Sequence, residues 1–247
     1  MILLLDIGNS RVKWGTLHSG KVAGHGAVPY TAAGLAQALS EMLDGQPRPD
    51  AVWISNVAGA AAGAAATAAC SSLWGLSARF AAPGLQALGI RNAYREPATL
   101  GVDRWLAMLA AHAHPGGRVC VVNCGTAVTV DIVDAAGMHL GGLIVPGVEL
   151  MIQSLSEATD AVSINPTGSP ADAFGRSTQE CVMNGTHAAV AALIERTLER
   201  LAAESGEQPR CVISGGGAPA VIPLLRSAVL HDPDLVLRGL ALLAGRE

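Results

Sequence analysis

The sequence predicts an α/β protein built from two related lobes, each a mixed β-sheet flanked by helices. Short apolar runs of strand length alternate with longer segments whose apolar residues recur at helical spacing. The order of strand, small-residue turn, β-meander and helices occurs twice, and it restarts after Pro115. Half of the 247 residues are hydrophobic and 15% are charged, which indicates a sizeable core. We therefore expect an N-terminal lobe over 1–115 and a C-terminal lobe over 116–247, with ligands bound between them.

The first lobe begins with a continuous apolar run, which predicts a buried strand that ends in a turn of small polar residues after Asp6. Thr31 is a candidate N-cap for the first helix, whose apolar residues share one face. Proline and glycine recur through 84–101, which predicts a loop. The expected strands are 2–6, 11–18, 21–28, 51–55 and 76–80, and the expected helices are 31–44, 58–70 and 102–114.

The second lobe repeats this order. A buried apolar strand runs into Asn123-Cys124-Gly125-Thr126, and two further strands follow around the turn at Ala136-Gly137. The expected strands are 119–122, 128–133, 140–145 and 211–213, and the expected helices are 148–157 and 177–204. One more helix, one short strand and a terminal helix complete the prediction.

Composition argues against several classes of protein. The net charge is −4 and no Lys/Arg cluster is present, so we expect no nucleic-acid partner. The five cysteines form no CxxC pair, so disulfides are not implied and we expect a reducing, cytoplasmic location. Cys120 and Cys124 lie in an apolar strand-like run, which favours buried free thiols over a metal site. The N-terminus lacks the pattern of a signal peptide, and the Ala-rich segment 57–70 is too short and too weakly apolar to span a membrane.

The first candidate motif runs from Asp6 to Lys13. The backbone N–H groups of its turn, together with the Asn9 and Ser10 side chains, can bind phosphate oxygens, and Gly8 allows a close approach. Asp6 can hold Mg²⁺ directly or through water. Lys13 adds a positive charge, in a chain with only two lysines against fourteen arginines. The alternative is an ordinary hairpin turn, for which the same residue types are typical.

The second motif, Asn123 to Asp131, has the same pattern of an apolar strand followed by glycine and hydroxyl side chains. Two such turns, one in each lobe, could grip one triphosphate between Asp6 and Thr126. The alternative is again a β-turn, with Thr129 and Asp131 facing solvent on a strand.

The third motif is Gly101-Val102-Asp103-Arg104, at the start of a predicted helix. Asp103 can accept the proton of an attacking hydroxyl, because phosphoryl transfer through a loose transition state tolerates a base with an ordinary pKa of about 3.9. Arg104 can clamp an anionic or hydroxylated substrate. The alternative for Asp103 is a favourable interaction with the helix dipole.

The fourth motif is the glycine run 215–217, which follows Ser214 and a strand. Glycines permit close backbone approach to a flat ring or a ribose. The sequence contains no GxxxxGK[ST], so a P-loop is excluded. None of the seven histidines forms a pair with metal-ligand spacing.

Taken together, these motifs make the chain resemble the type III pantothenate kinases, which belong to the superfamily of actin, sugar kinases and heat-shock chaperone ATPases. The resemblance spans almost the whole chain, and the order and spacing of its motifs are specific. The matching motifs are Asp6-x-Gly-Asn-Ser with Lys13, Asn92-Ala-Tyr94-x-x-Pro97-x-x-Leu-Gly101-x-Asp103-Arg104, Gly125-Thr126-Ala-x-Thr129-x-Asp131, Gly141-Gly142-x-Ile144-x-Pro146-Gly147, Gly175-x-x-Thr178 and the glycine run 215–217.

The resemblance implies a duplicated ribonuclease-H-like fold, a homodimer, and a requirement for ATP, Mg²⁺ and a monovalent cation such as K⁺ or NH₄⁺. Asp103 would be the proton acceptor. The ATP-binding residues would be Asp6, Ile7, Gly8, Asn9, Ser10, Arg11, Val12, Lys13, Thr126, Gly215 and Gly216. The residues that contact pantothenate would be Tyr94, Gly101, Val102, Asp103, Arg104 and Thr178.

One position departs from the family pattern. The family usually has Asp where this chain has Asn123, at a position tied to the monovalent cation. Asparagine keeps a carbonyl oxygen but loses the charge, so either the ion binds more weakly here or another group compensates.

The predicted function is therefore ATP-dependent phosphorylation of pantothenate to 4′-phosphopantothenate, the opening step of coenzyme A synthesis. Three alternatives remain open at this point. They are a kinase of a sugar or another small alcohol, a non-catalytic regulatory or accessory protein on the same ATP-binding fold, and a chaperone-type ATPase. The chain is short for the last of these and lacks an added substrate domain.

Overall fold

The computed structural model describes residues 1–31, 34–114, 116–158 and 174–246. It divides into two compact units. The first unit comprises Met1–His114 and Asp234–Glu247, and the second comprises Pro115–Pro233. The change of unit at 114–115 lies beside the predicted boundary, whereas the C-terminal segment, which the sequence pattern assigned to the second lobe, packs in the first unit. A repeat of strands marks where a second sheet begins, but it does not reveal against which sheet a terminal helix packs.

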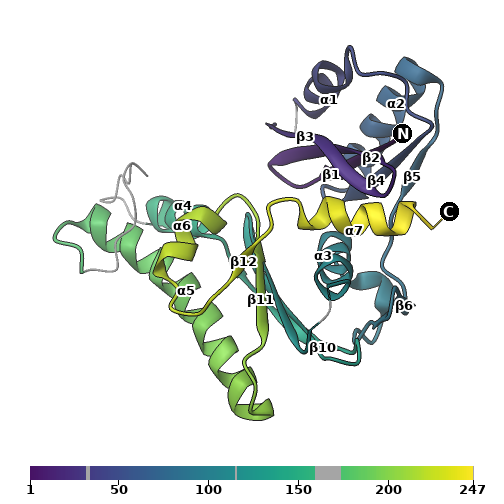
Figure 1. Ribbon diagram of the computed structural model, residues 1–247. Helices are drawn as coiled ribbons and strands as arrows, with labels where there is room; N and C mark the ends of the chain where they lie inside the picture. The colour runs from purple at the N-terminus through teal and green to yellow at the C-terminus, as the bar shows by residue number, and fades with distance from the viewer. Residues whose placement is uncertain (32–33, 115, 159–173, 247) are drawn as a thin grey trace. The chain divides into compact units, whose positions relative to one another are not determined.

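The first unit contains a five-stranded sheet of order β3-β2-β1-β4-β5 (Figure 1). Strand β1 pairs antiparallel with β2 and parallel with β4, so the sheet is mixed as predicted. The central strand β1 is buried over most of its length, because its apolar run packs on both faces. The strands are β1 (Ile2–Ile7), β2 (Arg11–His18), β3 (Lys21–Pro29), β4 (Ala51–Asn56) and β5 (Ala78–Phe80).

Helices cover both faces of this sheet. Helices α1 (Leu35–Leu43) and α2 (Ala60–Trp74) pack on one face, where a core cluster joins them to β1 and β4. Helix α7 (Leu235–Ala244) packs on β1 and β4, and α3 (Val102–His112) packs along α7 (Figure 1). Thr31 does not cap α1, because the helix begins after Gly34 without a side-chain cap.

The second unit repeats the topology of the first. Its sheet has the order β10-β9-β8-β11-β12, with β8 antiparallel to β9 and parallel to β11. The predicted duplication is therefore confirmed strand by strand. The strands are β8 (Val119–Cys124), β9 (Ala127–Val133), β10 (His139–Pro146), β11 (Arg210–Ser214) and β12 (Leu230–His231), and the helical segments are α4 (Val148–Ala158), α5 (Thr178–Ser205), α6 (Ala218–Val221) and the 3₁₀ helix η2 (Ile222–Leu224).

One face of this second sheet packs on α5 and α6. Val190 and Ile194 of α5 join Cys120 and Cys211 of the strands in one core cluster. The two cysteines are free and buried, as is Cys124, which confirms the prediction of buried thiols for Cys120 and Cys124. A metal or disulfide role is not needed to explain them, since free cysteine packs as a small hydrophobic residue.

The segment predicted as a loop, 84–101, contains only short elements. Strands β6 (Gln86–Ala87) and β7 (Ile90–Arg91) form a hairpin whose two turn residues, Leu88 and Gly89, have positive φ angles. The 3₁₀ helix η1 (Pro97–Thr99) follows, and α3 begins directly after Gly101.

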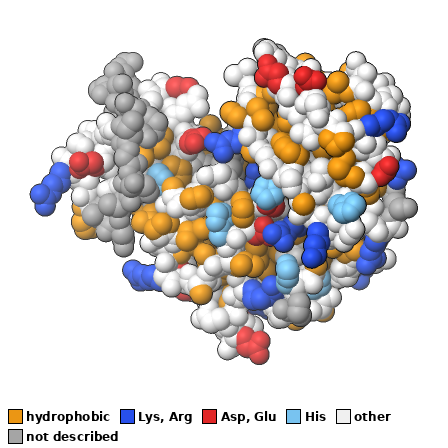
Figure 2. Space-filling model, turned by 45° about the horizontal axis from the view of Figure 1, so that its top comes forward, with side chains coloured by type: hydrophobic (Ala, Val, Ile, Leu, Met, Phe, Trp, Pro, Cys, Tyr) orange, Lys and Arg blue, Asp and Glu red, His pale blue; other side chains and the backbone are white. Residues whose placement is uncertain are grey.

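The described surface mixes residue types. On the face shown in Figure 2, basic and acidic side chains are interspersed with hydrophobic and uncharged ones. Among the residues that the structure describes, no helix combines the length and the hydropathy needed to cross a bilayer.

Candidate functional site

The turn between β1 and β2 presents polar groups to solvent. It is closed by a hydrogen bond from the N–H of Gly8 to the carbonyl of Arg11, with an N···O distance of 3.0 Å. Tyr30 fixes the turn from outside, because its N–H binds the Ser10 carbonyl and its hydroxyl binds the Gly8 carbonyl. Asn9 and Ser10 are exposed. The predicted phosphate turn is thus a tethered corner with exposed polar side chains.

Asp6 lies one residue before the end of β1 and is only 9% exposed. Its neighbours in the sheet are Lys13 on β2 and Ser55 on β4. The Ser55 hydroxyl donates a hydrogen bond of 2.9 Å to Asp6 Oδ1. The pKa of Asp6 is raised to about 6, because burial, the largest cause, and the charge of Asp103 outweigh the lowering by the Ser55 hydrogen bond and by Lys13. Asp6, Lys13 and Asp103 are therefore electrostatic neighbours within the first unit.

Sequence reasoning missed Ser55. The signal available was a hydroxyl in an otherwise apolar strand, at the position where a parallel neighbour would bring it level with Asp6. That signal is usable only after strand pairing is known, because Ser55 is 49 residues away from its partner.

Helix α3 places Asp103 in its first turn. Gly101 is the N-cap residue, and no side chain caps this helix end. A Cβ added at Gly101 would lie 2.7 Å from Asp103 Oδ1, so the carboxylate occupies the space that any other residue at 101 would fill. Because Gly101 has no side chain, the Asp103 carboxylate can lie in this position.

Arg104 is held next to Asp103. It is 6% exposed, and its Nη1 donates a hydrogen bond of 2.7 Å to the Tyr94 hydroxyl. Its guanidinium carbon also lies 5.6 Å from the centroid of the Tyr94 ring, within range of a cation–π interaction. Asp6, Lys13 and Asp103 are thus linked through their charges, and Tyr94 contacts Arg104, the residue that follows Asp103 in α3.

In the second unit, the turn after β8 packs against Gly147. The N–H of Gly125 binds the Ala127 carbonyl at 3.1 Å, and the N–H of Gly147 binds the Thr126 carbonyl at 2.8 Å. A Cβ at Gly147 would lie 2.1 Å from the Gly125 carbonyl oxygen, so the two backbones approach as closely as only glycine permits. Thr126 itself is exposed at this corner.

The glycine run packs on the same turn. Gly215 has a φ of +95°, and a Cβ there would lie 2.3 Å from the Cys124 carbonyl oxygen and 2.7 Å from Asn123 Oδ1. The N–H of Gly217 donates a hydrogen bond of 2.9 Å to the same carbonyl. The predicted phosphate turn and the predicted nucleoside-binding glycines of the second unit are thus one corner of packed backbone.

Asn123 occupies the place in this unit that Asp6 occupies in the first. Each is the fifth residue of its central strand. Asn123 pairs in register with Thr129 and Ser214, as Asp6 pairs with Lys13 and Ser55. The duplication therefore extends to the polar residues at the ends of the strands.

Three other positions of the second unit that the sequence singled out are also located. Thr178 is the first residue of α5, where the Ser177 side chain accepts a hydrogen bond from the Glu180 N–H. Thr129 and Asp131 are buried at 8% and 1% exposure, so the alternative that they face solvent is wrong. Asp131 Oδ1 lies 3.1 Å from His139 Nε2, which partly explains its burial.

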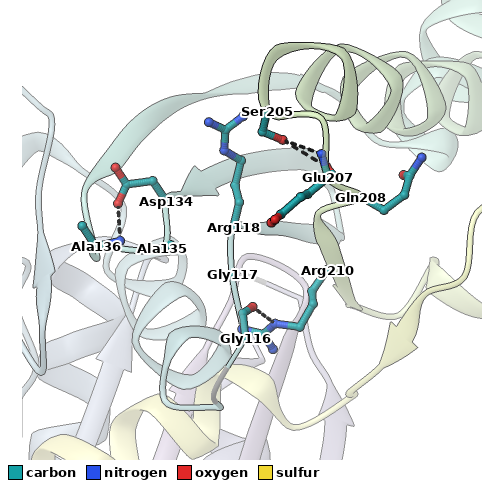
Figure 3. A pocket seen from close by; sticks show the side chains of 10 residues that line it. All are labelled: Gly116, Gly117, Arg118, Asp134, Ala135, Ala136, Ser205, Glu207, Gln208 and Arg210. Carbon is teal, nitrogen blue, oxygen red and sulfur yellow. Dashed lines mark hydrogen bonds between the residues drawn. The ribbon is translucent and has the colours of Figure 1, made fainter.

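A hollow of about 540 Å³ lies at the other end of the second sheet (Figure 3). It is formed where β8 and β11 begin and where β9 ends, whereas the 124–127 turn joins the opposite ends of β8 and β9. In Figure 3 the Arg210 side chain binds the Gly116 carbonyl, and the Asp134 carboxylate accepts the Ala136 N–H. No predicted site residue is among the described residues that line it, which are Gly116, Gly117, Arg118, Asp134, Ala135, Ala136, Ser205, Glu207, Gln208 and Arg210.

Comparison with known proteins identifies the family to which this chain is similar. The family model described as type III pantothenate kinase matches residues 2–200. A type III pantothenate kinase of Nitrosococcus oceani is 38% identical over 249 residues, which cover 99% of this chain and 94% of that protein. Another, of Azoarcus sp. strain BH72, is 38% identical over 252 residues and covers 100% of this chain and 92% of its own.

Among solved structures, a conserved Campylobacter jejuni protein described as a Baf family transcriptional activator has a TM-score of 0.64. It is 19% identical, with 99% of this chain and 98% of that chain covered, so this likeness concerns the fold alone. The fold, the order of the motifs and the near full-length relatives agree, and this chain belongs to the type III pantothenate kinase family.

Proposed function

We propose that this chain transfers the γ-phosphate of ATP to the hydroxyl of pantothenate, giving 4′-phosphopantothenate and ADP, with Asp103 as the proton acceptor. Family membership supports the overall reaction as the opening step of coenzyme A synthesis. The observation that carries the residue assignment is the position of Asp103. It lies within the electrostatic reach of Asp6 and beside the Arg104–Tyr94 pair.

The phosphates of ATP would be held mainly by backbone and point charges. The proposed binding residues of the first unit are Asp6 to Lys13, whose turn is tethered by Tyr30 and exposes Asn9 and Ser10. Those of the second unit are Thr126, Gly215 and Gly216. Lys13 and the turn amides would stabilise the charge of the transferring phosphoryl group, which is the main requirement of this chemistry.

Asp6 is the proposed Mg²⁺ ligand. Among the described residues, no group of three or more His, Cys, Asp and Glu side chains is arranged to hold a metal ion. One carboxylate nevertheless fits Mg²⁺, which usually binds through one or two carboxylates, water and substrate phosphates. Burial disfavours the charged form of Asp6, and a bound cation would supply the missing counter-charge. Bound Mg²⁺ would neutralise charge on the β- and γ-phosphates.

Arg104 and Tyr94 form the proposed recognition pair for pantothenate. Pantothenate carries a carboxylate, and a buried guanidinium that is already oriented by a hydroxyl and a ring can bind it with little loss of entropy. Gly101, Val102 and Thr178 complete the proposed set of substrate contacts. Because the Arg104 side chain is fixed before substrate arrives, its substitution by Lys would not be conservative.

We assign the monovalent cation to Asn123. Its Oδ1 is a neutral oxygen ligand at the corner where the turn after β8 meets Gly215. If K⁺ or NH₄⁺ binds there, turnover will depend on its concentration, and Asn123→Asp will lower the concentration needed for half-maximal activity. Equal activity in K⁺, NH₄⁺ and Na⁺ buffers would contradict this assignment.

We further propose that the chain is a cytoplasmic homodimer. Strand β10 is an edge strand of the second sheet, and Leu143 and Ile144 on it are 48% and 58% exposed. Leu150 and Leu155 of the following helix α4 are also exposed. An exposed apolar edge strand invites pairing with another chain. The double substitution Leu143→Glu with Ile144→Glu should shift the protein to a monomer in size-exclusion chromatography with light scattering.

A coupled ADP-release assay tests the proposed reaction. Purified protein should release ADP with pantothenate, and not with a panel of sugars and other small alcohols. Asp103→Asn should keep the fold and lose most of the turnover, and near-normal turnover would remove Asp103 from the mechanism. Complementation of a pantothenate-kinase-deficient strain separates an enzyme from an accessory protein, the alternative suggested by the description of the Campylobacter jejuni structure.

A further inference from the structure

We infer that Asn92 is a positioning residue for the pantothenate site, acting through Tyr94. This inference rests on the proposed role of Tyr94 and Arg104 in binding pantothenate. Asn92 is a polar residue only 5% exposed, in a segment of the first unit with little regular structure. It belongs to the motif that pointed to the family, yet the proposed reaction gives it no task.

The side chain of Asn92 ties three parts of its loop together. Its Nδ2 donates one hydrogen bond of 3.1 Å to the carbonyl of Gly84, before the β6–β7 hairpin, and another of 3.2 Å to the carbonyl of Pro97, where η1 begins. Its Oδ1 accepts the N–H of Tyr94 at 3.0 Å. Both ends of the amide group are therefore used, and each partner is backbone.

These bonds determine where Tyr94 lies. The segment between β7 and η1 has no ladder of its own, so the Asn92–Tyr94 contact is an Asx-type turn that fixes the backbone at 94. The Tyr94 ring and hydroxyl then orient Arg104, at 5.6 Å and 2.7 Å. A chain of contacts therefore runs from Asn92 through Tyr94 to Arg104, which is the residue next to the proposed base.

The side chain of Asn92 contacts the loop that carries the proposed pantothenate-binding residue Tyr94. The hydrogen-bond partners of its side chain are Gly84, Tyr94 and Pro97, and none of the proposed ATP-binding residues is among them. Loss of the side chain should therefore weaken pantothenate binding and leave ATP binding unchanged. A residue that only stabilised the fold would lower the amount of active enzyme and would leave both KM values unchanged.

A matched control exists in the same loop. The exposed Thr99 hydroxyl donates a hydrogen bond of 2.8 Å to the Glu96 carbonyl, and this bond does not involve Tyr94. Thr99→Val removes that bond while keeping the shape of the side chain. Comparing Thr99→Val with Asn92→Ala therefore separates the general loss of a loop hydrogen bond from the loss of the bond that fixes Tyr94.

The experiment measures kcat and both KM values by ADP release for the wild type, Asn92→Ala, Asn92→Asp and Thr99→Val, with a thermal unfolding curve for each. Asn92→Ala should raise the KM for pantothenate by about tenfold or more and change the KM for ATP by less than about twofold. Asn92→Asp keeps the acceptor for Tyr94 and loses both donors, so its pantothenate KM should lie between those of the wild type and Asn92→Ala. Thr99→Val should match the wild type.

Each outcome has a defined meaning. A pantothenate KM in Asn92→Ala that equals that of Thr99→Val would overturn the inference, as would equal rises in the KM values of pantothenate and ATP. If Asn92→Ala does not fold, the same two criteria apply to Asn92→Asp. A wild-type protein that releases no ADP with pantothenate would refute the proposed function instead, because no variant is needed to observe it.

Discussion

Replacement of Gly101 by alanine tests the proposed position of the catalytic carboxylate. The added Cβ at position 101 would lie 2.7 Å from Asp103 Oδ1, whereas ordinary contacts begin at 3.4 Å, so the carboxylate would have to move by about 0.7 Å. Displacements near 1 Å at a reacting group cost up to about 100-fold in rate, and we therefore expect kcat to fall by about 10- to 100-fold.

The fold should tolerate this change. Gly101 has φ −58° and ψ 131°, which alanine adopts without strain, and the obstructing atom is the end of a movable side chain. We expect an unchanged or slightly raised Tm, because alanine restricts the unfolded chain.

The assay is steady-state ADP release with saturating pantothenate and ATP, together with a thermal unfolding curve. Gly84→Ala is the control, since its Cβ would meet only the Gln86 carbonyl, at 3.9 Å. A normal kcat in Gly101→Ala would refute the reasoning. A rise confined to the KM for pantothenate would show that residue 101 acts on substrate binding and does not set the position of the Asp103 carboxylate.

Two further predictions concern stability. The folded-state pKa of Asp6, about 6, exceeds its ordinary value of 3.8, so the folded state binds more protons between these values and its stability falls as pH rises through this range. At pH 7.5 in EDTA, Asp6→Asn should therefore unfold at a higher temperature than the wild type, by an amount equivalent to at most about 3 kcal/mol. This gain in stability should shrink towards pH 5, and a gain that does not depend on pH would contradict the prediction. Gly239→Ala should destabilise the fold by at least about 2 kcal/mol, since its Cβ would lie 2.0 Å from the Leu106 carbonyl oxygen. Gly185 is an exposed helix position with open space around it, so Gly185→Ala should stabilise the fold by about 1 kcal/mol. Denaturant unfolding of both variants checks this, and equal effects would refute it.

The sequence predicted the elements well where their signal is local. Buried strands such as β1 and β8 are continuous apolar runs, and the long helix α5 begins within one residue of its predicted start at 177. The repeated order of strands predicted the repeated sheet topology. The starts of helices were predicted less accurately. Thr31 was the candidate N-cap of α1, but the helix begins after Gly34, which occupies the N-cap position without a side-chain hydrogen bond.

Contacts between residues that are distant in sequence could not be predicted. Ser55 becomes a partner of Asp6 only through the pairing of β1 with β4, and Gly147 meets the 125–126 turn only through the packing of β10 against β9. The proximity of Asp103 to Asp6 likewise depends on how α3 packs within the first unit. The motifs therefore identified candidate residues, and the structure supplied the neighbours that orient them.

The placement of α7 in the first unit has a consequence for how the chain folds. The second unit is a continuous stretch of chain, inserted between α3 and the helix against which α3 packs. During synthesis the ribosome therefore releases every residue of the second unit before the first unit can gain its last helix. A nascent chain that stops short of residue 234 would expose the apolar side of α3, and the proposed catalytic helix would be completed only after the residues of α7 had emerged.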